Sequence, residues 1–304
     1  MNPLLAAVLW PILTGAGLAV AALPRAWELR LGALLGRLAL SVDSKRRRIA
    51  GDNIRRCLPE LDAAGRNALL RANYEHYGRL CLELLHMFCP LPGHYRRYVE
   101  ANAVVDNLDV WSRADAKGKG TIIVTGHFAN WEMMGIAGLR GLRAMVTGRR
   151  LKPAWLNARI VAARLSVNTR TASGRRILPE LIRWVKEGNS SVFILDQYAA
   201  PPAGVPVRFF GVLADTQAAV GLVAQRTGAP VLMLFQRRDR VGTIHDVFED
   251  VPLGEAQLKD PAAAAQELAA RVERWIRAQP DQWLWAHRRF KNVVWPDDDS
   301  DRKT

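Results

Sequence analysis

The sequence predicts an α/β fold: a single domain with a mixed sheet flanked by helices, preceded by a membrane-anchoring N-terminal helix. Short β-branched runs such as Thr121–Thr125 alternate with stretches of helical periodicity. The chain has 304 residues, 49% of them hydrophobic, which suffices to fill one sizeable core. Its first two dozen residues are almost uncharged. We therefore expect an anchor helix (1–24), one folded domain (25–296) and a disordered acidic tail (297–304).

The N-terminal segment Pro3–Leu23 is uncharged and long enough to enter or cross a bilayer as a helix. Positively charged residues follow it at Arg25, Arg30, Arg37 and Lys45–Arg48. Such residues mark the cytoplasmic side, so we expect the body of the protein on the cytoplasmic face of the inner membrane. A secretory signal peptide is an alternative, although no Lys or Arg precedes the segment. Pro11 and two glycines leave open a re-entrant or interfacial insertion instead of a straight spanning helix.

Two further helices are predicted before the centre of the chain. Leu29–Leu40 is apolar with Arg at intervals, which favours an interfacial helix or a buried amphipathic one. Asp62 is expected to cap a helix that runs to about Phe88, with apolar residues at three- and four-residue spacing. The histidines in this region match no metal-ligand spacing, so we expect His76, His86 and His94 to be structural or exposed.

The stretch from Thr121 to Gly135 carries the predicted chemistry. Thr121–Thr125 is typical of a strand buried on both faces, and a glycine ends it. His127 then emerges at the strand's carboxyl end, the edge where open α/β sheets bind ligands. Asn130 can cap the helix that follows, with Glu132 in its first turn.

His127 and Glu132 can converge across this corner between strand and helix. A carboxylate that holds one ring nitrogen of a histidine makes the other nitrogen a general base. No serine nucleophile accompanies the pair, so a substrate hydroxyl would attack directly, without an acyl-enzyme. The alternative is an ordinary turn histidine followed by an ordinary first-turn acid.

The rest of the chain alternates between strands and helices. Strands are predicted at Arg143–Thr147, Ser191–Leu195, Pro230–Phe235 and Gly242–Phe248. Helices are predicted at 150–164, 176–186, 217–227 and 261–278. Asp196 and Gln197 directly follow one of these strands, at the same edge as His127 if the two strands are parallel. The proline-rich loop 199–204 could gate a substrate.

Composition restricts the partners and the chemistry. The net charge of +14 favours an anionic partner: nucleic acid, a phospholipid surface or an acidic carrier protein. No nucleic-acid-binding motif is present, and the apolar N-terminus favours a membrane. Cys57, Cys81 and Cys89 form no CxxC pair and are odd in number, so a disulfide framework is not expected. Serine-hydrolase, zinc-protease, Walker A and dinucleotide motifs are all absent, and the inferred reaction needs no metal or cofactor.

Several blocks resemble one known family. The heptapeptide Gly126–Glu132 is similar to the His-x4-Asp/Glu block of the lysophospholipid acyltransferase superfamily, in the form used by the bacterial lipid A late acyltransferases (lauroyl/myristoyl type). Further blocks follow the family's order, at Arg48–Ile54, Cys57–Glu60, Asp196–Gln197, Val207–Gly211 and Gln282–Lys291. The resemblance extends over most of the chain.

The resemblance implies a glycerolipid acyltransferase-like fold for the domain, with His127 and Glu132 as catalytic residues. It also implies an Arg about one helix downstream, best matched by Arg164, and a second position matched by Arg149. Either Arg alone would be a common surface charge. Substrate or oxyanion contacts are implied for Arg164, Arg149, Asn130, Asp196, Gln197, Phe210 and Gly211. The sequence departs from the family at Arg208, where a small or cyclic residue is usual, and before Pro153, where an Asn is missing.

We therefore expect a membrane-bound O-acyltransferase. His127 would deprotonate a hydroxyl of a lipid A precursor while that oxygen attacks the thioester of an acyl carrier protein or of acyl-CoA. Glu132 would fix the imidazole tautomer, and Arg164 would face the developing oxyanion or an acceptor phosphate. Another glycolipid or phospholipid acceptor is one alternative. A non-catalytic, basic membrane-binding scaffold is another.

Overall fold

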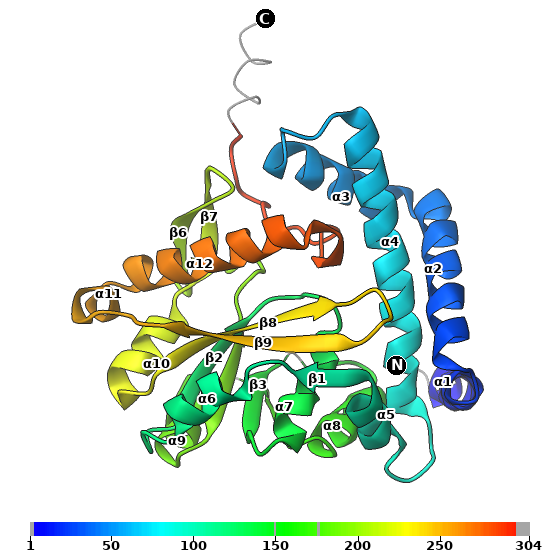
Figure 1. Ribbon diagram of the computed structural model, residues 1–304, viewed down its shortest axis with the longest axis horizontal. Coiled ribbons are helices and arrows are strands. Elements are labelled where there is room, and N and C mark those ends of the chain that lie inside the picture. The colour runs from blue at the N-terminus through cyan, green and yellow to red at the C-terminus, as the bar shows by residue number, and fades with distance from the viewer. Residues whose placement is uncertain (1–2, 149, 175–176, 296–304) are drawn as a thin grey trace, which may run out of the picture.

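A computed structural model describes residues 3–148, 150–174 and 177–295 of the chain, with side chains from residue 8 onward. Its centre is a seven-stranded sheet in the order β1-β9-β8-β2-β5-β3-β4 (Figure 1). The strands are β1 Ala103–Val105, β2 Thr121–Thr125, β3 Ala144–Thr147, β4 Thr169–Ala172, β5 Ser190–Ile194, β8 Val231–Arg238 and β9 Ile244–Val251. Neighbouring strands are parallel except β8 and β9, which are antiparallel. The predicted mixed sheet is confirmed.

Strands β2 and β5 lie side by side at the middle of the sheet. They are parallel, with Thr125 paired with Ile194 at their carboxyl ends. Both strands are almost fully buried, as their β-branched composition predicts for strands covered on both faces. The segments that follow them, at His127 and at Asp196, therefore leave the sheet at the same edge.

Helices cover both faces of the sheet. One face packs Ile122, Val124 and Phe193 against α9 Ile177–Lys186, α10 Ala219–Thr227 and α12 Pro261–Ala278. The other face packs Ile123 and Val192 against α6 Leu108–Asp115 and α7 Gly135–Leu139. The remaining helical segments of the domain are α5 His94–Asn102, α8 Ala154–Leu165, α11 Glu255–Lys259, η1 His86–Phe88, η2 Trp131–Met134 and η3 Pro280–Gln282. A helix-flanked sheet is thus confirmed.

A separate antiparallel hairpin, β6 Gly204–Phe209 and β7 Val212–Gln217, packs beside α12. Its two-residue turn is Phe210–Gly211, both with positive φ (50° and 80°). Such a turn matches the twist of a hairpin. Residues 207–211 were expected only as a family block, and the hairpin was not predicted. Gly204, predicted to end a loop, begins β6.

Four N-terminal helices stand at one end of the sheet: α1 Pro3–Ala21, α2 Arg25–Val42, α3 Ser44–Cys57 and α4 Ala63–Leu85. Figure 1 shows α2 and α4 side by side. They approach closely through glycines, because a Cβ on Gly36 would lie 2.1 Å from the Tyr74 carbonyl oxygen and one on Gly78 would lie 2.1 Å from that of Gly32. The predicted helix 29–40 lies inside α2. The predicted cap is confirmed, since Asp62 accepts a 2.7 Å hydrogen bond from the Gly65 amide.

The prediction of a spanning N-terminal helix is not supported. Residues Pro3–Ala21 do form helix α1, but within the described part of the chain no helix is both long and apolar enough to cross a membrane. Instead α1 lies against α4 and η1, where a Cβ on Gly17 would meet the Cys89 backbone nitrogen at 2.7 Å. The predicted acidic tail, 297–304, lies outside the described residues.

Candidate active site

His127 is held by Asp196 at the carboxyl edge of the sheet. Nδ1 of His127 lies 2.8 Å from Oδ1 of Asp196, and the His127 backbone N–H donates to Oδ2 at 2.7 Å. Because β2 and β5 are parallel neighbours, the loops after them bring together two residues 69 positions apart. With Nδ1 donating to the carboxylate, a neutral ring presents the Nε2 lone pair as a base.

The surroundings of this pair set its protonation. Burial opposes charge on His127, but the negative charge and hydrogen bond of Asp196 outweigh it and raise the pKa of the imidazole above its usual 6.5. Burial also opposes the charge of Asp196, which by itself would raise the pKa of this carboxyl. The interactions with His127 and with the indole N–H of Trp283 outweigh that effect, so the pKa of Asp196 is lowered. Asp196 is therefore ionised at neutral pH. It favours the imidazolium that forms when His127 accepts a proton.

The C-terminal segment supports the pair from behind. Trp283 donates from Nε1 to Oδ2 of Asp196 at 2.7 Å, and its backbone pairs with Phe128. Two buried asparagines fix this segment: Asn73 donates to the carbonyls of residues 281 and 283, and Asn53 donates to those of residues 285 and 287. The blocks around Asn53 and Trp283 were both part of the predicted resemblance. Their mutual contact had no signal in the sequence.

Gln197 also reaches His127. Its amide nitrogen lies 3.1 Å from Nε2 and 3.4 Å from Nδ1. Since it is almost equally distant from the two ring nitrogens, it contacts the ring as a whole and does not point at the lone pair of one nitrogen. The His127 side chain is 13% exposed, against 2% for Asp196. A substrate hydroxyl can therefore approach the histidine but not the aspartate.

Glu132 does not hold His127, contrary to the predicted pairing. Its carboxylate instead accepts two hydrogen bonds from Arg164, from Nε at 2.8 Å and from Nη2 at 2.6 Å. Arg164 also donates to the Thr171 hydroxyl. Glu132 and Arg164 were both predicted as site residues and are brought together. The spacing from His127 to Glu132 could not reveal that Asp196, in the loop after the neighbouring strand, is the residue that binds Nδ1 of His127.

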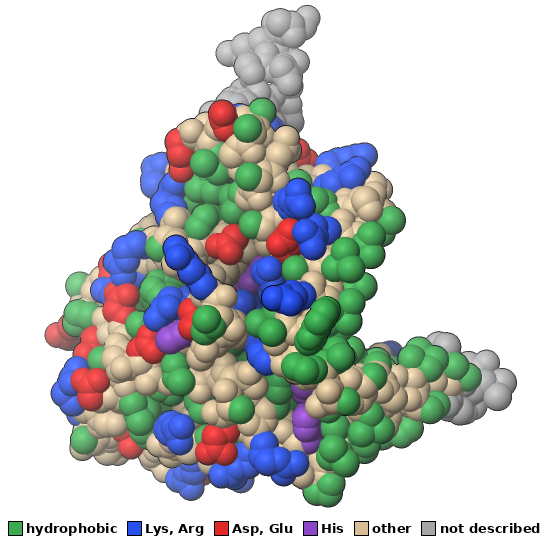
Figure 2. All heavy atoms as spheres, turned by 45° about the vertical axis from the view of Figure 1, so that its right-hand side comes forward, with side chains coloured by type: hydrophobic (Ala, Val, Ile, Leu, Met, Phe, Trp, Pro, Cys, Tyr) green, Lys and Arg blue, Asp and Glu red, His purple; other side chains and the backbone are tan. Residues whose placement is uncertain are grey.

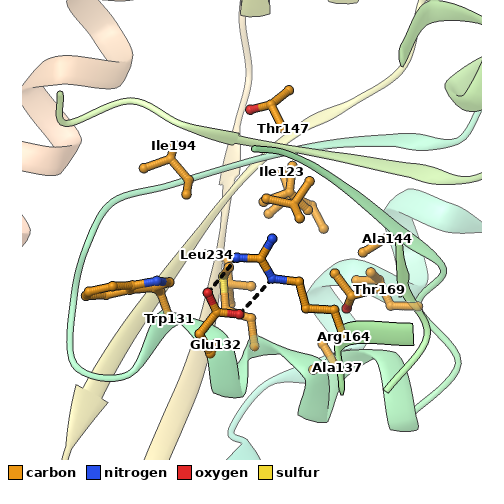
Figure 3. A pocket seen from close by; sticks show the side chains of 15 residues that line it. Ile123, Trp131, Glu132, Ala137, Ala144, Thr147, Arg164, Thr169, Ile194 and Leu234 are labelled. Atoms are coloured by element: carbon orange, nitrogen blue, oxygen red, sulfur yellow. Dashed lines mark hydrogen bonds and ion pairs between the residues drawn. The ribbon is translucent and has the colours of Figure 1, made fainter. Parts of the chain in front are cut away.

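The bidentate pair of Glu132 and Arg164 borders a small apolar cavity of about 50 Å³ (Figure 3). The walls come from four neighbouring strands and include Ile123, Val146, Ile194 and Leu234. Trp131 closes one side, and its ring packs edge-on against the His127 ring with centroids 4.8 Å apart. Trp131 therefore contacts the cavity as well as the His127 ring.

Asn130 does not cap the following helix. It makes no capping hydrogen bond, and its Nδ2 instead donates to Oε2 of Glu83 at 2.8 Å. Glu83 is fully buried and also binds Arg238 and Arg25. This ionic cluster fixes the loop that carries His127, and the sequence analysis did not identify it. In the sequence, Glu83 is a single acid in a predicted helix, and nothing indicates that its partners are Arg25 of α2 and Arg238 of β8.

Three other predicted site residues lie elsewhere or cannot be placed. Phe210 packs on Trp283 and Trp285, one layer behind the His127–Asp196 pair, and Gly211 forms the hairpin turn beside it. Arg149 lies outside the described residues. No cluster of three or more His, Cys, Asp or Glu side chains suited to a metal ion occurs among the residues that the structure places.

Comparison with known proteins places this geometry in context. Residues 4–292 match the family model described as bacterial lipid A biosynthesis acyltransferase. The chain is 27% identical over 271 residues to the lipid A biosynthesis lauroyltransferase of Escherichia coli K12, covering 86% of this chain and 84% of that protein. It is 26% identical to the palmitoleoyltransferase of the same organism, with the same coverage. It is also 28% identical over 235 residues to the phosphatidylinositol mannoside acyltransferase of Mycobacterium tuberculosis, covering 76% and 73%.

Proposed function

The chain belongs to the bacterial lipid A biosynthesis acyltransferase family and is an acyltransferase with a lipid acceptor, and on this premise we propose that it acylates a hydroxyl of a lipid A precursor. The donor is an acyl thioester, carried by an acyl carrier protein or by CoA. The observation that carries the proposal is the His127–Asp196 pair, partly open to solvent beside an apolar cavity. No metal or cofactor takes part in the proposed reaction.

In the proposed mechanism His127 is the general base. Its Nε2 removes the proton of the acceptor hydroxyl as that oxygen attacks the thioester carbonyl, while Asp196 stabilises the imidazolium. The tetrahedral intermediate collapses, the C–S bond breaks, and His127 returns the proton to the leaving thiolate. The products are an ester and a free thiol. Asp196 takes the orienting role that the sequence analysis gave to Glu132.

Arg164 and Glu132 act as one unit in this proposal. The guanidinium borders the cavity and faces the developing oxyanion or an acceptor phosphate, and the Glu132 carboxylate fixes its orientation through two hydrogen bonds. The apolar wall next to the pair suits the first methylenes of the acyl chain, because no unpaired polar group would be buried against them.

We further propose that the N-terminal helices hold the enzyme at the cytoplasmic face of the inner membrane without requiring a span. Large apolar side chains are exposed along α1 and α2, among them Trp10, Ile12, Trp27, Leu34 and Leu38. Figure 2 shows this apolar strip with basic side chains gathered beside it. An apolar face bordered by cations is typical of a helix lying in the lipid headgroup region.

The acceptor is tested by comparing extracted lipids of a deletion strain and its parent by mass spectrometry. Loss of one acyl chain from lipid A supports the proposal. A second candidate, acylation of a phosphatidylinositol mannoside or another glycolipid, is favoured by the similarity to the mycobacterial enzyme. Unchanged lipid A with an altered glycolipid would select that candidate.

The catalytic assignment is tested with purified protein and a labelled acyl thioester. His127→Ala should lower turnover by roughly 10²–10⁴-fold, the range typical for a lost general base. Wild-type turnover in this variant would remove His127 from the mechanism. If the wild type transfers the acyl chain to none of the lipid hydroxyls offered, a non-catalytic scaffold is favoured.

A further inference from the structure

An open groove of about 730 Å³ lies between α2, α4 and the turn that joins β8 to β9. It is separate from the cavity beside Glu132 and shares no lining residue with it. Five arginines line it, against two carboxylates, Glu75 and Asp239. The arginines are Arg30, Arg37, Arg79, Arg238 and Arg240. The groove therefore carries an excess of positive charge.

The two carboxylates offset only part of that excess, and both already have other partners. Asp239 is engaged by the backbone N–H groups of residues 241, 242 and 243 and by the His245 ring. Glu75 is shared, because Arg37, Arg71 and Arg79 all lie within 4 Å of it. Within the described part of the chain no carboxylate lies within 4 Å of Arg30 or Arg240.

Two arginines of the groove lining, the buried Arg238 and the half-buried Arg79, lie close enough for their charges to interact. Arg238 is held by Glu83 at Nη1 and Nη2, whereas the shared Glu75, at 3.5 Å, is the one carboxylate within 4 Å of Arg79 among the described residues. Burial and the positive charge of Arg238 both lower the pKa of Arg79. An anion placed between these side chains would relieve their repulsion.

The position of the groove identifies the source of such an anion. Its wall on α2 includes Leu29, Arg30 and Ala33, and the same helix exposes Trp27, Leu31, Leu34 and Leu38. In Figure 2 basic side chains border an apolar strip on this side of the molecule. A ligand with a phosphate in the groove and acyl chains along α2 would satisfy both surfaces, since guanidinium groups bind phosphate oxygens in pairs.

We propose that this groove binds the phosphate headgroup of a membrane lipid, as a site additional to the catalytic one. Arg30, whose guanidinium also lies over the Trp27 ring, and Arg240 supply guanidinium groups with no carboxylate partner among the described residues, and Arg79 and Arg238 add positive charge beside them. Arg238 is also linked through Glu83 to Asn130, in the loop that carries His127. A lipid bound in the groove would therefore place the membrane surface next to the ionic cluster of Glu83 that fixes this loop. The inference uses the proposed orientation of α2 towards the membrane but not the acyl-transfer chemistry.

The test is calorimetric titration of the full chain with dihexanoyl phosphatidic acid below its micelle concentration, without donor or membrane. The double variant Arg30→Gln/Arg240→Gln should bind this lipid about tenfold or more weakly. Both side chains are exposed and lack carboxylate partners, so the fold should persist. The matched control Arg183→Gln/Arg226→Gln removes the same charge from exposed positions on α9 and α10 and should change the affinity less than about twofold.

Glu75→Gln gives a test with the opposite sign. It removes the shared carboxylate while keeping its shape, so binding should tighten several-fold, a gain that misfolding cannot produce. Titration with inorganic phosphate separates the two sources of the anion, and binding about tenfold weaker than the lipid is expected. Equal affinity for phosphate and lipid, equal losses in the two double variants, or unchanged affinity in Arg30→Gln/Arg240→Gln would each overturn the proposal. Because no acyl donor is present, failure of the proposed acyl transfer would leave this measurement unaffected.

Discussion

Asp196 gives His127 a pH dependence that can be measured. The net effect of its surroundings is to raise the pKa of His127 above 6.5, and only the neutral imidazole accepts the hydroxyl proton. The acid limb of kcat/KM should therefore lie above pH 6.5. Asp196→Asn removes the negative charge that raises the pKa of His127. The acid limb of kcat/KM should therefore move to lower pH, while kcat falls by roughly 10²–10⁴-fold. The measurement is a pH–rate profile of both proteins.

Glu132→Gln is the matched control for that experiment. It removes one carboxylate charge at the same site, but Glu132 is hydrogen-bonded to Arg164 and has a smaller influence on the pKa of His127 than Asp196 has. The acid limb should move less than in Asp196→Asn. A larger shift in Glu132→Gln would restore the histidine–glutamate pairing that the sequence suggested.

Asp246, a buried acid on β9, gives the protein a second pH dependence that can be measured. Asp246 is fully buried, and burial raises its pKa to about 8 from an ordinary value of 3.8. Its Oδ1 accepts from Gln236 Nε2 at 2.6 Å, while its Oδ2 and Gln236 Oε1 have no partner in the structure. Asn at this position keeps the shape of the side chain and carries no charge at any pH.

Asp246→Asn should therefore stabilise the protein at alkaline pH, by about 1–3 kcal/mol at pH 8. The sign follows from the raised pKa. The unfolded chain releases the Asp246 proton near pH 4, the folded one only near pH 8, so the wild type loses stability between these values. Urea unfolding at pH 5 and pH 8 should show a larger advantage of the variant at pH 8. An equal or smaller advantage at pH 8 would mean that Asp246 is ionised in the folded protein.

Among the helices, the crossing of α2 and α4 depends on missing side chains. A Cβ at Gly78 would lie 2.1 Å from the Gly32 carbonyl oxygen and 2.5 Å from the Gly36 nitrogen, both backbone atoms that cannot rotate away. Gly78→Val should separate the helices and lower the free energy of unfolding by about 1–3 kcal/mol. Gly51→Val in α3 is the control, because its Cβ would meet only the Leu70 side chain, at 4.0 Å. Equal stability of the two variants would contradict this close crossing.

Sequence patterns predicted those elements whose signal is local. Thr121–Thr125 and Pro261–Ala278 were predicted with their observed bounds, because β-branched runs and amphipathic periodicity act over a few residues. Helix α3, Ser44–Cys57, was missed, since its run of Lys and Arg hides the apolar positions that pack on the core. Contacts across the sheet were also beyond a local pattern, so Asp196 was placed at the correct edge without its bond to His127.

On the scale of the whole molecule, the His127–Asp196 pair, the apolar strip and the cationic groove are connected through one buried ionic cluster. Arg25 of α2 and Arg238 of β8 both bind Glu83 of α4, which holds Asn130 three residues after His127. The helices proposed to meet the membrane are thereby tied to the loop that carries the base. A long-chain acceptor leaves a bilayer at a cost of about 0.8 kcal/mol for each exposed methylene, so the enzyme must come to the lipid.

The last prediction tests that approach. In Leu34→Ser/Leu38→Ser two exposed side chains of α2, 46% and 55% accessible, lose their apolar contact with a bilayer while the core is untouched. Vesicle binding and activity on membrane-embedded acceptor should fall by roughly tenfold or more, since each lost leucine contact is worth on the order of 1 kcal/mol. Activity on acceptor dispersed in detergent should change little. Leu213→Ser/Val294→Ser changes two apolar residues outside α1 and α2 that are even more exposed, at 62% and 65%, and should retain full activity in both assays. If the α2 variant keeps full vesicle binding, the membrane contact lies on another surface, and α1, with Trp10 and Ile12 exposed, is the next one to mutate.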